Sequence, residues 1–321
     1  MRRFNSFGRF AKEKFGGRRL QKVNIDAGFT CPNRDGTLGY GGCVYCNNDS
    51  FRPGACRPVL PVRQQIEKGI AYLGGRYKAD LFLAYFQPFT NTYAPVGELE
   101  SLYLEALAHP LVAGLAIGTR PDCVDEQKIA LLERLARSHF ILIEYGLQSM
   151  YEKSLRFIER GHGFEAFLKA VELTQGKGIG IGVHLIAGIP TETREETLLM
   201  AERISELSPV GFLKLHQLQV VKNTKLARSY AENPFPVFGY EEYIDFTVDF
   251  LERLRADIVI QRLFATAPDE LLIAPRWDVD RHRILRDIED RLEKRDTFQG
   301  KKLTPSPNQI HAGADRPGGP C

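Results

Sequence analysis

The sequence has no long run of apolar residues. Hydrophobic residues make up 43% of its 321 positions, which is ordinary for a globular protein with a sizeable core. No apolar stretch reaches the roughly 18–20 residues that cross a bilayer. The first residues are charged and lead into Lys12-Glu13-Lys14 rather than into an apolar segment, so we expect no secretion signal. These absences predict a protein that makes no use of a membrane.

Cysteine is scarce, and the excess of charge is small. Six cysteines in 321 residues, three of them close together, do not form the framework of a disulfide-rich secreted domain. A reducing cytoplasm fits better. The net charge of +3 is too small to indicate nucleic-acid binding by itself.

Short apolar runs alternate with amphipathic stretches along most of the chain. The predicted strands are 22–25, 81–86, 115–118, 140–146, 179–186, 211–217 and 258–260. The predicted helices are 62–72, 96–108, 126–136, 164–175, 195–207 and 240–255. Regular alternation with short links implies parallel strands. The six or seven units predict an α/β fold, a partial parallel barrel of the (β/α)6 type with a short C-terminal extension.

Four segments follow from this pattern. Residues 1–21 form a basic N-terminal arm, 22–260 the barrel, 261–300 a helical extension and 301–321 a disordered tail. The tail is predicted because it is rich in proline and glycine and almost free of apolar residues.

The most informative feature is a cysteine triplet with the spacing C-x11-C-x2-C. Its members are Cys31, Cys43 and Cys46. Three close thiolates can hold three irons of a four-iron cluster and leave the fourth open for a ligand. The triplet follows the first strand, and active sites of parallel barrels lie at the C-terminal ends of their strands.

The alternative for this triplet is structural zinc, which needs four ligands in a tetrahedron. Cys56 is a candidate fourth ligand, since it follows Cys46 by ten positions. Cys123 follows the third predicted strand and is expected to be packed. Cys321 is expected to be an incidental thiol of the tail.

The segment Gly41-Gly42-Cys43-Val44-Tyr45-Cys46 resembles the cluster loop of radical S-adenosylmethionine (SAM) enzymes. It is similar to the branch that holds the elongator catalytic subunit and oxygen-independent coproporphyrinogen oxidase, and more so to a family of uncharacterised bacterial radical SAM proteins. Further motifs carry the resemblance from about residue 15 to about 302: 25–36, 85–93, 118–122, 146–149, 160–162 and 295–301.

The resemblance implies a [4Fe-4S] cluster on Cys31, Cys43 and Cys46, and SAM on the open iron. It further implies an electron donor such as flavodoxin or ferredoxin. SAM would be bound by five side chains: Tyr45 beside the adenine, Gln148 and His184 at the ribose, Arg160 at the carboxylate and Gln87 near the amino group. At His184 the porphyrin-synthesis relatives carry an acidic residue, which leaves that contact in question.

The substrate is less constrained. Residues 2–22 contain eight basic side chains against one acid, with four interleaved phenylalanines; such a segment can contact phosphates and stack on unpaired bases. Together with the elongator-like resemblance, this favours transfer RNA, with the arm across the barrel mouth. The chain is too short to include an added acetyltransferase domain. A small-molecule radical enzyme and a non-catalytic iron–sulfur sensor or electron carrier are the alternatives.

Overall fold

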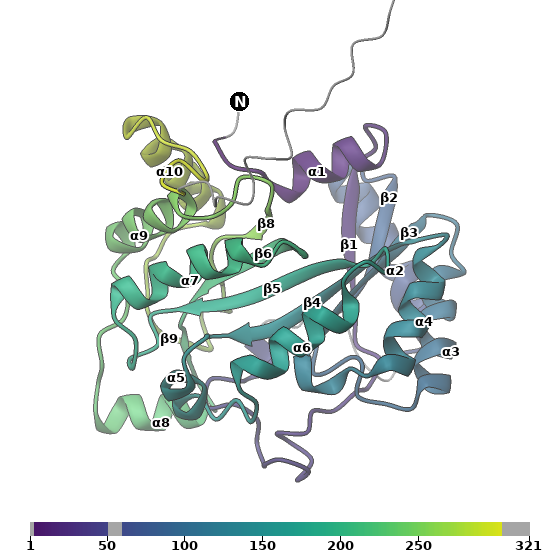
Figure 1. Ribbon diagram of the computed structural model, residues 1–321, viewed down its shortest axis with the longest axis horizontal. Helices are drawn as coiled ribbons and strands as arrows, with labels where there is room; N and C mark the ends of the chain where they lie inside the picture. The colour runs from purple at the N-terminus through teal and green to yellow at the C-terminus, as the bar shows by residue number, and fades with distance from the viewer. Residues whose placement is uncertain (1–2, 51–59, 304–321) are drawn as a thin grey trace, which may run out of the picture.

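Seven parallel strands form the centre of the molecule, a computed structural model that describes residues 3–50 and 60–303 (Figure 1). The strands are β1 Leu20–Ile25, β2 Leu81–Phe86, β3 Val112–Thr119, β4 Phe140–Gln148, β5 Gly180–Ala187, β6 Val210–Gln217 and β8 Val259–Arg262. They are hydrogen-bonded in the order β1-β2-β3-β4-β5-β6-β8, and the sheet curls into a partial barrel. The predicted α/β architecture is confirmed.

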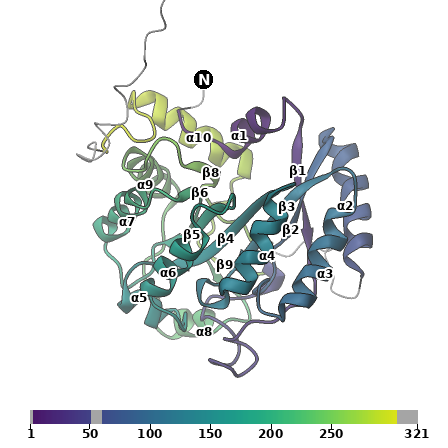
Figure 2. The ribbon, with the colours of Figure 1, turned by 45° about the vertical axis from the view of Figure 1, so that its right-hand side comes forward.

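Helices cover the outer face of this sheet (Figure 2), namely α2 Val62–Tyr77, α3 Val96–Leu107, α4 Glu126–Ala136, α6 Phe164–Thr174, α7 Arg194–Glu206 and α9 Tyr240–Glu252. Helix α10 Arg281–Lys294 packs on α9, and the short helices α5 Glu152–Phe157 and α8 Lys225–Glu232 lie at the C-terminal ends of the strands. The predicted capping box at the start of α7 is present, with Thr193 and Glu196 bonding each other's backbone N–H. Within the described segments, no helix combines the length and apolar character that a bilayer crossing requires.

Two cores lie on opposite faces of the sheet because strand side chains alternate in direction. On β4, Ile141 and Ile143 pack in the large core beneath the helices. Leu142, between them, packs in a separate inner core with Phe212 of β6. Glu144 therefore points into the barrel interior, toward the ends of the strands where the cysteine loop begins.

Three short helices and two short strands were not predicted. Helix α1, Phe7–Lys14, precedes the barrel, and α5 follows β4. Helix α8 follows β7 Val220–Val221, which pairs antiparallel with β9 Leu272–Ala274 from much later in the chain. The backbone of α8 is tied to the cysteine loop, since Leu226 N donates to Val44 O at 2.8 Å. The missed elements near α8 therefore support the loop that carries the triplet.

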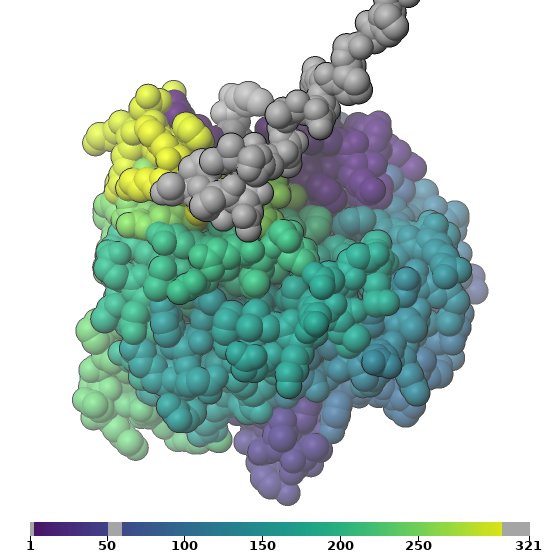
Figure 3. All heavy atoms as spheres, in the orientation of Figure 1, coloured from purple at the N-terminus to yellow at the C-terminus, as the bar shows by residue number. Residues whose placement is uncertain are grey.

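The basic arm does not lie across the barrel mouth, so that part of the prediction is wrong. Helix α1 lies at the N-terminal ends of the strands, and the cysteine loop projects from the opposite end (Figures 1 and 3). The ring centroid of Phe10 is 5.0 Å from that of Phe212 and 5.8 Å from that of Phe140, the first residue of β4. The phenylalanines interpreted as stacking platforms instead fill the bottom of the barrel.

The two ends of the described chain meet beside β8. Ile260 N donates to Asn5 O at 2.7 Å, and Gln299 Nε2 donates to Ile258 O at 2.9 Å. The motif at 295–301 is thus part of this closure. Lys302 N continues it by donating to Glu252 O, while residues 304–321 of the predicted tail lie outside the described residues.

The barrel is not closed by backbone hydrogen bonds, because β1 and β8 are the edges of the sheet. A side-chain bond spans the seam instead: Lys22 Nζ on β1 donates to Gln261 Oε1 on β8. Lys22 also lies over the rings of Phe7 and Tyr85, 4.9 and 4.7 Å from their centroids. Helix α1, the seam and the barrel interior therefore share one buried lysine.

Candidate functional site

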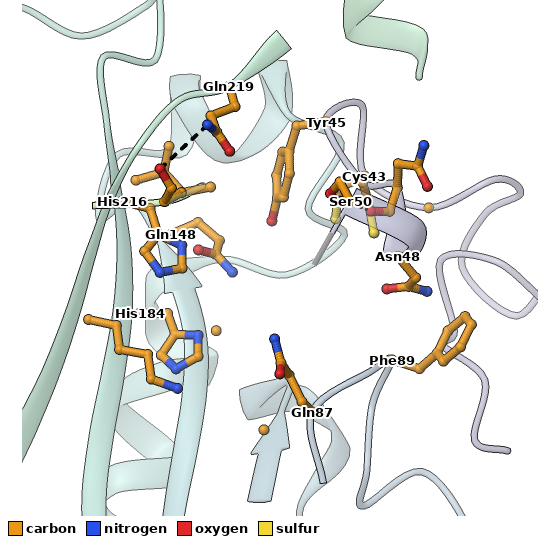
Figure 4. A pocket seen from close by; sticks show the side chains of 18 of the residues that line it. Cys43, Tyr45, Asn48, Ser50, Gln87, Phe89, Gln148, His184, His216 and Gln219 are labelled. Atoms are coloured by element: carbon orange, nitrogen blue, oxygen red, sulfur yellow. Dashed lines mark hydrogen bonds between the residues drawn. The ribbon is translucent and has the colours of Figure 1, made fainter. Parts of the chain in front are cut away.

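A cavity opens at the C-terminal ends of the strands, between the cysteine loop and the barrel interior (Figure 4). It encloses about 1340 Å³ of space between atoms, a volume that includes space open to solvent. All predicted site residues line it, namely Cys31, Cys43, Cys46, Tyr45, Gln87, Gln148, Arg160 and His184. Their placement is as expected; their individual roles stay predictions.

The cysteine loop is held in shape by a single buried amide. Asn33 Nδ2 donates to Glu159 O at 2.8 Å and to Arg160 O at 2.9 Å, and lies 3.5 Å from Cys43 Sγ. Asn33 O in turn accepts from Gly42 N. Gly42 has φ of 88°, and a Cβ there would come within 2.9 Å of the Arg34 guanidinium. The glycine thus allows Arg34 to lie against the loop.

Two arginines contact the thiols. Arg160 Nη1 lies 3.5 Å from Cys43 Sγ, and Arg34 Nη2 lies 3.2 Å from Cys46 Sγ. Burial alone would raise the pKa of the Cys43 thiol, but the Arg160 guanidinium outweighs burial and lowers it. Burial and the neighbouring Cys43 raise the pKa of Cys46. The arginines supply positive charge where thiolate ligands need it.

The donor set fits a cluster better than a single ion. Within residues 3–50 and 60–303, no three His, Cys, Asp or Glu side chains converge tightly enough to hold one metal ion. Zinc would require such convergence. Cys123 is buried away from the cavity, and its pKa is raised to about 12 by burial; Cys56 lies outside the described residues. Three thiols around one cavity match a cluster that binds each through a different iron.

Arg160 and Gln148 are fixed at the end of β4. Arg160 is buried, with 6% of its surface exposed, and its Nε donates to Gly146 O at 3.1 Å. Gln148 adopts a φ of +77° next to a register irregularity in β4. A non-glycine residue in this region costs energy, and such residues cluster at functional sites. The turn aims the Gln148 side chain into the cavity, and the bond to Gly146 O holds the Arg160 side chain beside it.

Tyr45 and Gln87 point into the same space from different walls. In Figure 4 they project between Cys43 on one side and His184 and His216 on the other. The Gln87 amide is oriented by Asn24, whose Nδ2 donates to Gln87 Oε1 at 2.8 Å. Ala265 and Thr266, which follow β8, also line the cavity.

A buried polar network forms the inner end of the cavity, and sequence analysis identified only its histidine. Glu144 is fully buried and accepts from Lys22 at 2.9 Å, from Lys214 at 2.5 Å and from His184 at 3.2 Å. Burial would raise the pKa of Glu144, but Lys214 and Lys22 outweigh it and hold the pKa well below its usual range. One sequence feature could have indicated this network. Lys214 and His216 are polar residues at alternate positions of an otherwise apolar strand, so both point to the same face of the sheet.

Arg120 lies in the motif at 118–122, and the sequence analysis gave it no role of its own. It is 2% exposed, pairs through two bonds with Asp122 at 2.9 and 2.7 Å, and donates to Arg160 O at 2.8 Å. Arg120 therefore fixes the backbone that presents Arg160 to the cavity.

Comparisons with known proteins agree with this geometry. Residues 31–204 match the Radical SAM superfamily, and residues 210–294 match the Radical_SAM C-terminal domain. The uncharacterized protein YtqA of Bacillus subtilis (strain 168) is 31% identical, over 94% of this chain and 92% of its own length. A tRNA uridine(34) acetyltransferase of Methanocaldococcus infernus is 30% identical, over 44% of this chain and 26% of its own.

The fold also matches a solved structure, the archaeal Methanocaldococcus infernus Elp3 with an N-terminal deletion (1-46). The TM-score is 0.66, the sequence identity 17%, and the match covers 88% of this chain and 64% of that chain. The cysteine triplet, the partial parallel barrel and the matched family agree. The chain belongs to the Radical SAM superfamily, whose cofactors are a [4Fe-4S] cluster and SAM.

Proposed function

We propose that this protein is a radical SAM enzyme that takes a hydrogen atom from a nucleoside of transfer RNA. The observation that supports catalysis is that three cluster cysteines, five side chains expected to bind SAM and a further buried polar network all line one cavity. A cysteine loop whose cavity is also lined by side chains suited to an organic ligand argues against a mere sensor or electron carrier.

Different residues of the chain bind the cluster, bind SAM and exclude water. Cys31, Cys43 and Cys46 hold three irons. Arg160, Gln148, Tyr45, Gln87 and His184 hold SAM, and the barrel wall excludes water. When bound, the cofactor pair supplies an electron from a donor such as flavodoxin or ferredoxin and a carbon radical that abstracts hydrogen.

The RNA part of the proposal rests on the relatives and on the surface beside the cavity. The matched tRNA uridine(34) acetyltransferase acts on tRNA by its name. Exposed Lys222 lies next to the cavity wall, because its carbonyl accepts from Nδ2 of Asn47, a lining residue, at 2.9 Å. Exposed Arg228 lies on α8, the helix whose backbone is tied to the cysteine loop. A nucleoside turned out of the RNA would enter the cavity while these cations contact phosphates. A small metabolite is the alternative substrate.

The test is anaerobic reconstitution followed by assays for cluster, SAM cleavage and RNA modification. The protein should hold about four irons and four sulfides per chain and release 5′-deoxyadenosine with dithionite and SAM. Ala at Cys31, Cys43 or Cys46 should abolish both properties. Cys123→Ala, a matched buried cysteine, and Cys56→Ala should retain both. Loss of the metal in Cys56→Ala, or zinc as the metal found, would contradict the proposal.

The substrate is tested separately. Transfer RNA from cells lacking the protein is incubated with the reconstituted enzyme, SAM and reductant, and its nucleosides are analysed by mass spectrometry. A nucleoside mass change that is absent with Cys43→Ala supports an RNA substrate. Strong 5′-deoxyadenosine formation without any nucleoside change in total RNA favours the small-molecule alternative.

A further inference from the structure

The inner end of the cavity carries more positive than negative charge. Its lining, here called the floor, consists of Tyr85, Glu144, His184, Lys214, His216 and Arg262. Glu144 is the single acidic residue that lines the cavity in the described part of the chain. One carboxylate therefore faces the side chains of Lys214, Lys22 and Arg262, whose formal positive charges exceed it by two. Burial lowers the pKa of Lys214, and the neighbouring Glu144 opposes that change.

The carboxylate cannot serve a further cation. Glu144 Oε1 already accepts from Lys22, and Oε2 accepts from Lys214 and His184. Burial lowers the pKa of Lys22, with Glu144 opposing that change and Arg262 adding to it. A second negative group placed here would meet the unbalanced cations at close range, where low dielectric strengthens the attraction.

One nitrogen on the floor has no partner. The Nε2 atom of His216 is buried and makes no hydrogen bond within residues 3–50 and 60–303. An unsatisfied buried polar atom costs roughly 1–3 kcal/mol. His216 lies two positions after Lys214 on β6, so both side chains point into the barrel. Its ring centroid is 6.1 Å from that of His184, on the same wall of the cavity (Figure 4).

Neighbouring groups orient these donors. Lys214 Nζ donates to Tyr85 Oη at 2.7 Å as well as to Glu144, so two bonds fix the ammonium on the floor. Lys214 pairs with Arg262 in the register between β6 and β8, which brings the guanidinium beside it. The free nitrogen of His216 completes three donor groups that belong to two neighbouring strands.

We propose that the floor binds an oxyanion, a carboxylate or a phosphate monoester, that the substrate carries into the barrel. Lys214 and Arg262 balance its charge, and His216 donates Nε2–H to it. This proposal rests on the proposed function for the statement that the cavity receives the substrate. Helix α1 fills the other end of the barrel with Phe7 and Phe10, so the oxyanion has to be part of the group that enters.

The test uses the reconstituted holoenzyme with SAM and three probes of similar shape: benzoate, phenyl phosphate and benzamide. Anaerobic titration calorimetry measures their affinities. At least one anion should bind ten-fold or more tightly than neutral benzamide, and the tighter anion identifies which oxyanion is preferred. Arg262→Gln, at an exposed residue, and His216→Phe should each reduce that affinity by about ten-fold.

Arg286→Gln, an exposed arginine on α10, is the matched control and should bind the anions as the wild type does. Iron content and melting temperature verify that each variant folds. Equal affinity for all three probes, or anion binding unaffected by both Arg262→Gln and His216→Phe, overturns the proposal.

Formation of 5′-deoxyadenosine separates the two hypotheses. If it forms but no anion is preferred, the floor proposal fails and the proposed enzymatic function stands. If anions bind as expected but no 5′-deoxyadenosine forms, the floor stands as an anion site and the enzymatic function fails.

Discussion

At the scale of single residues, the site depends on charged groups that burial would otherwise disfavour. Arg160 combines two roles, because it bonds the Gly146 carbonyl and also lies against Cys43 Sγ. Glu144 stays ionised because cations surround it. Each of these groups is stable in place only with its partners present.

Arg160→Ala should weaken SAM binding by about 1.5–3 kcal/mol, the scale of a charge-assisted hydrogen bond. Anaerobic equilibrium dialysis against labelled SAM measures the change, with iron content determined in parallel. Arg156→Ala, an exposed arginine on α5, is the control and should keep wild-type affinity. If Arg160→Ala retains a full cluster and binds SAM as tightly as the wild type does, Arg160 has a structural role and does not bind SAM.

His184 predicts a pH dependence of stability. Burial, and then the nearby Lys214, lower its pKa from 6.5 to about 4, against the effect of Glu144. Between pH 4 and pH 6.5, His184 is therefore protonated in the unfolded chain and neutral in the folded protein. The free energy of unfolding should be unaffected by His184 above pH 6.5 and should fall by up to about 3 kcal/mol as the pH drops to 4.

Urea denaturation of the metal-free protein across this pH range measures the effect. His184→Gln should show a flatter profile between pH 6.5 and 4, and His282→Gln, at an exposed position, should match the wild type. Parallel profiles for wild type and His184→Gln would contradict the lowered pKa.

The shared position of the predicted site residues at one cavity follows from the sequence, because these residues lie in short local motifs at the ends of strands. Cys31, Cys43 and Cys46 stand within sixteen positions, and their spacing alone indicates a metal. The floor could not be predicted in the same way. Glu144, Lys214 and His216 are isolated polar residues in apolar strands, and only the curl of the sheet brings them together.

At the scale of elements, the predicted strands and helices correspond to observed ones, whereas α1, α5, α8, β7 and β9 were not predicted. In α1 the basic composition concealed an amphipathic pattern. Helix α1 has Phe7 and Phe10 on the face that meets Phe212, with basic residues elsewhere. The many basic residues favoured a nucleic-acid arm, whereas the spacing of the aromatic residues was the structural signal.

Phe10→Ala should lower the free energy of unfolding by about 2 kcal/mol, less than a fully buried phenylalanine would cost, because Phe10 is only partly buried. Urea denaturation measures this, with the exposed Lys12→Ala on the same helix as the control. Equal stability of Phe10→Ala and wild type would show that α1 is not part of the barrel's packing.

At the scale of the whole molecule, the two ends of the barrel have different functions. The N-terminal end is filled by α1 and by the segment around Gln299. The cavity, the cysteine loop and α8 lie at the other end (Figure 1). An RNA substrate therefore has to approach the end that carries Lys222 and Arg228 rather than the basic arm.

Replacing Lys222 and Arg228 by Gln should reduce the salt dependence of transfer RNA binding, by about one unit of slope for each phosphate that the protein then no longer neutralises. Replacing Lys12 and Lys14 on α1 should leave the slope unchanged. Filter binding between low and physiological salt measures both. A smaller slope only in the Lys12 and Lys14 variant would restore the arm as the segment that binds RNA.

The bonds of Asn33 have a consequence for how the protein is made. Cys31, Cys43 and Cys46 are synthesised well before the residues that hold their loop. Asn33 bonds to carbonyls 126 and 127 positions further along the chain, and Arg3 bonds to the carbonyl of Thr297, 294 positions away. The loop therefore cannot take its final shape until α5 and Arg160 have been synthesised, and the seam beside β8 cannot close until the segment around Thr297 has been synthesised. Binding of a cluster in the folded geometry of this loop accordingly requires at least the first half of the barrel.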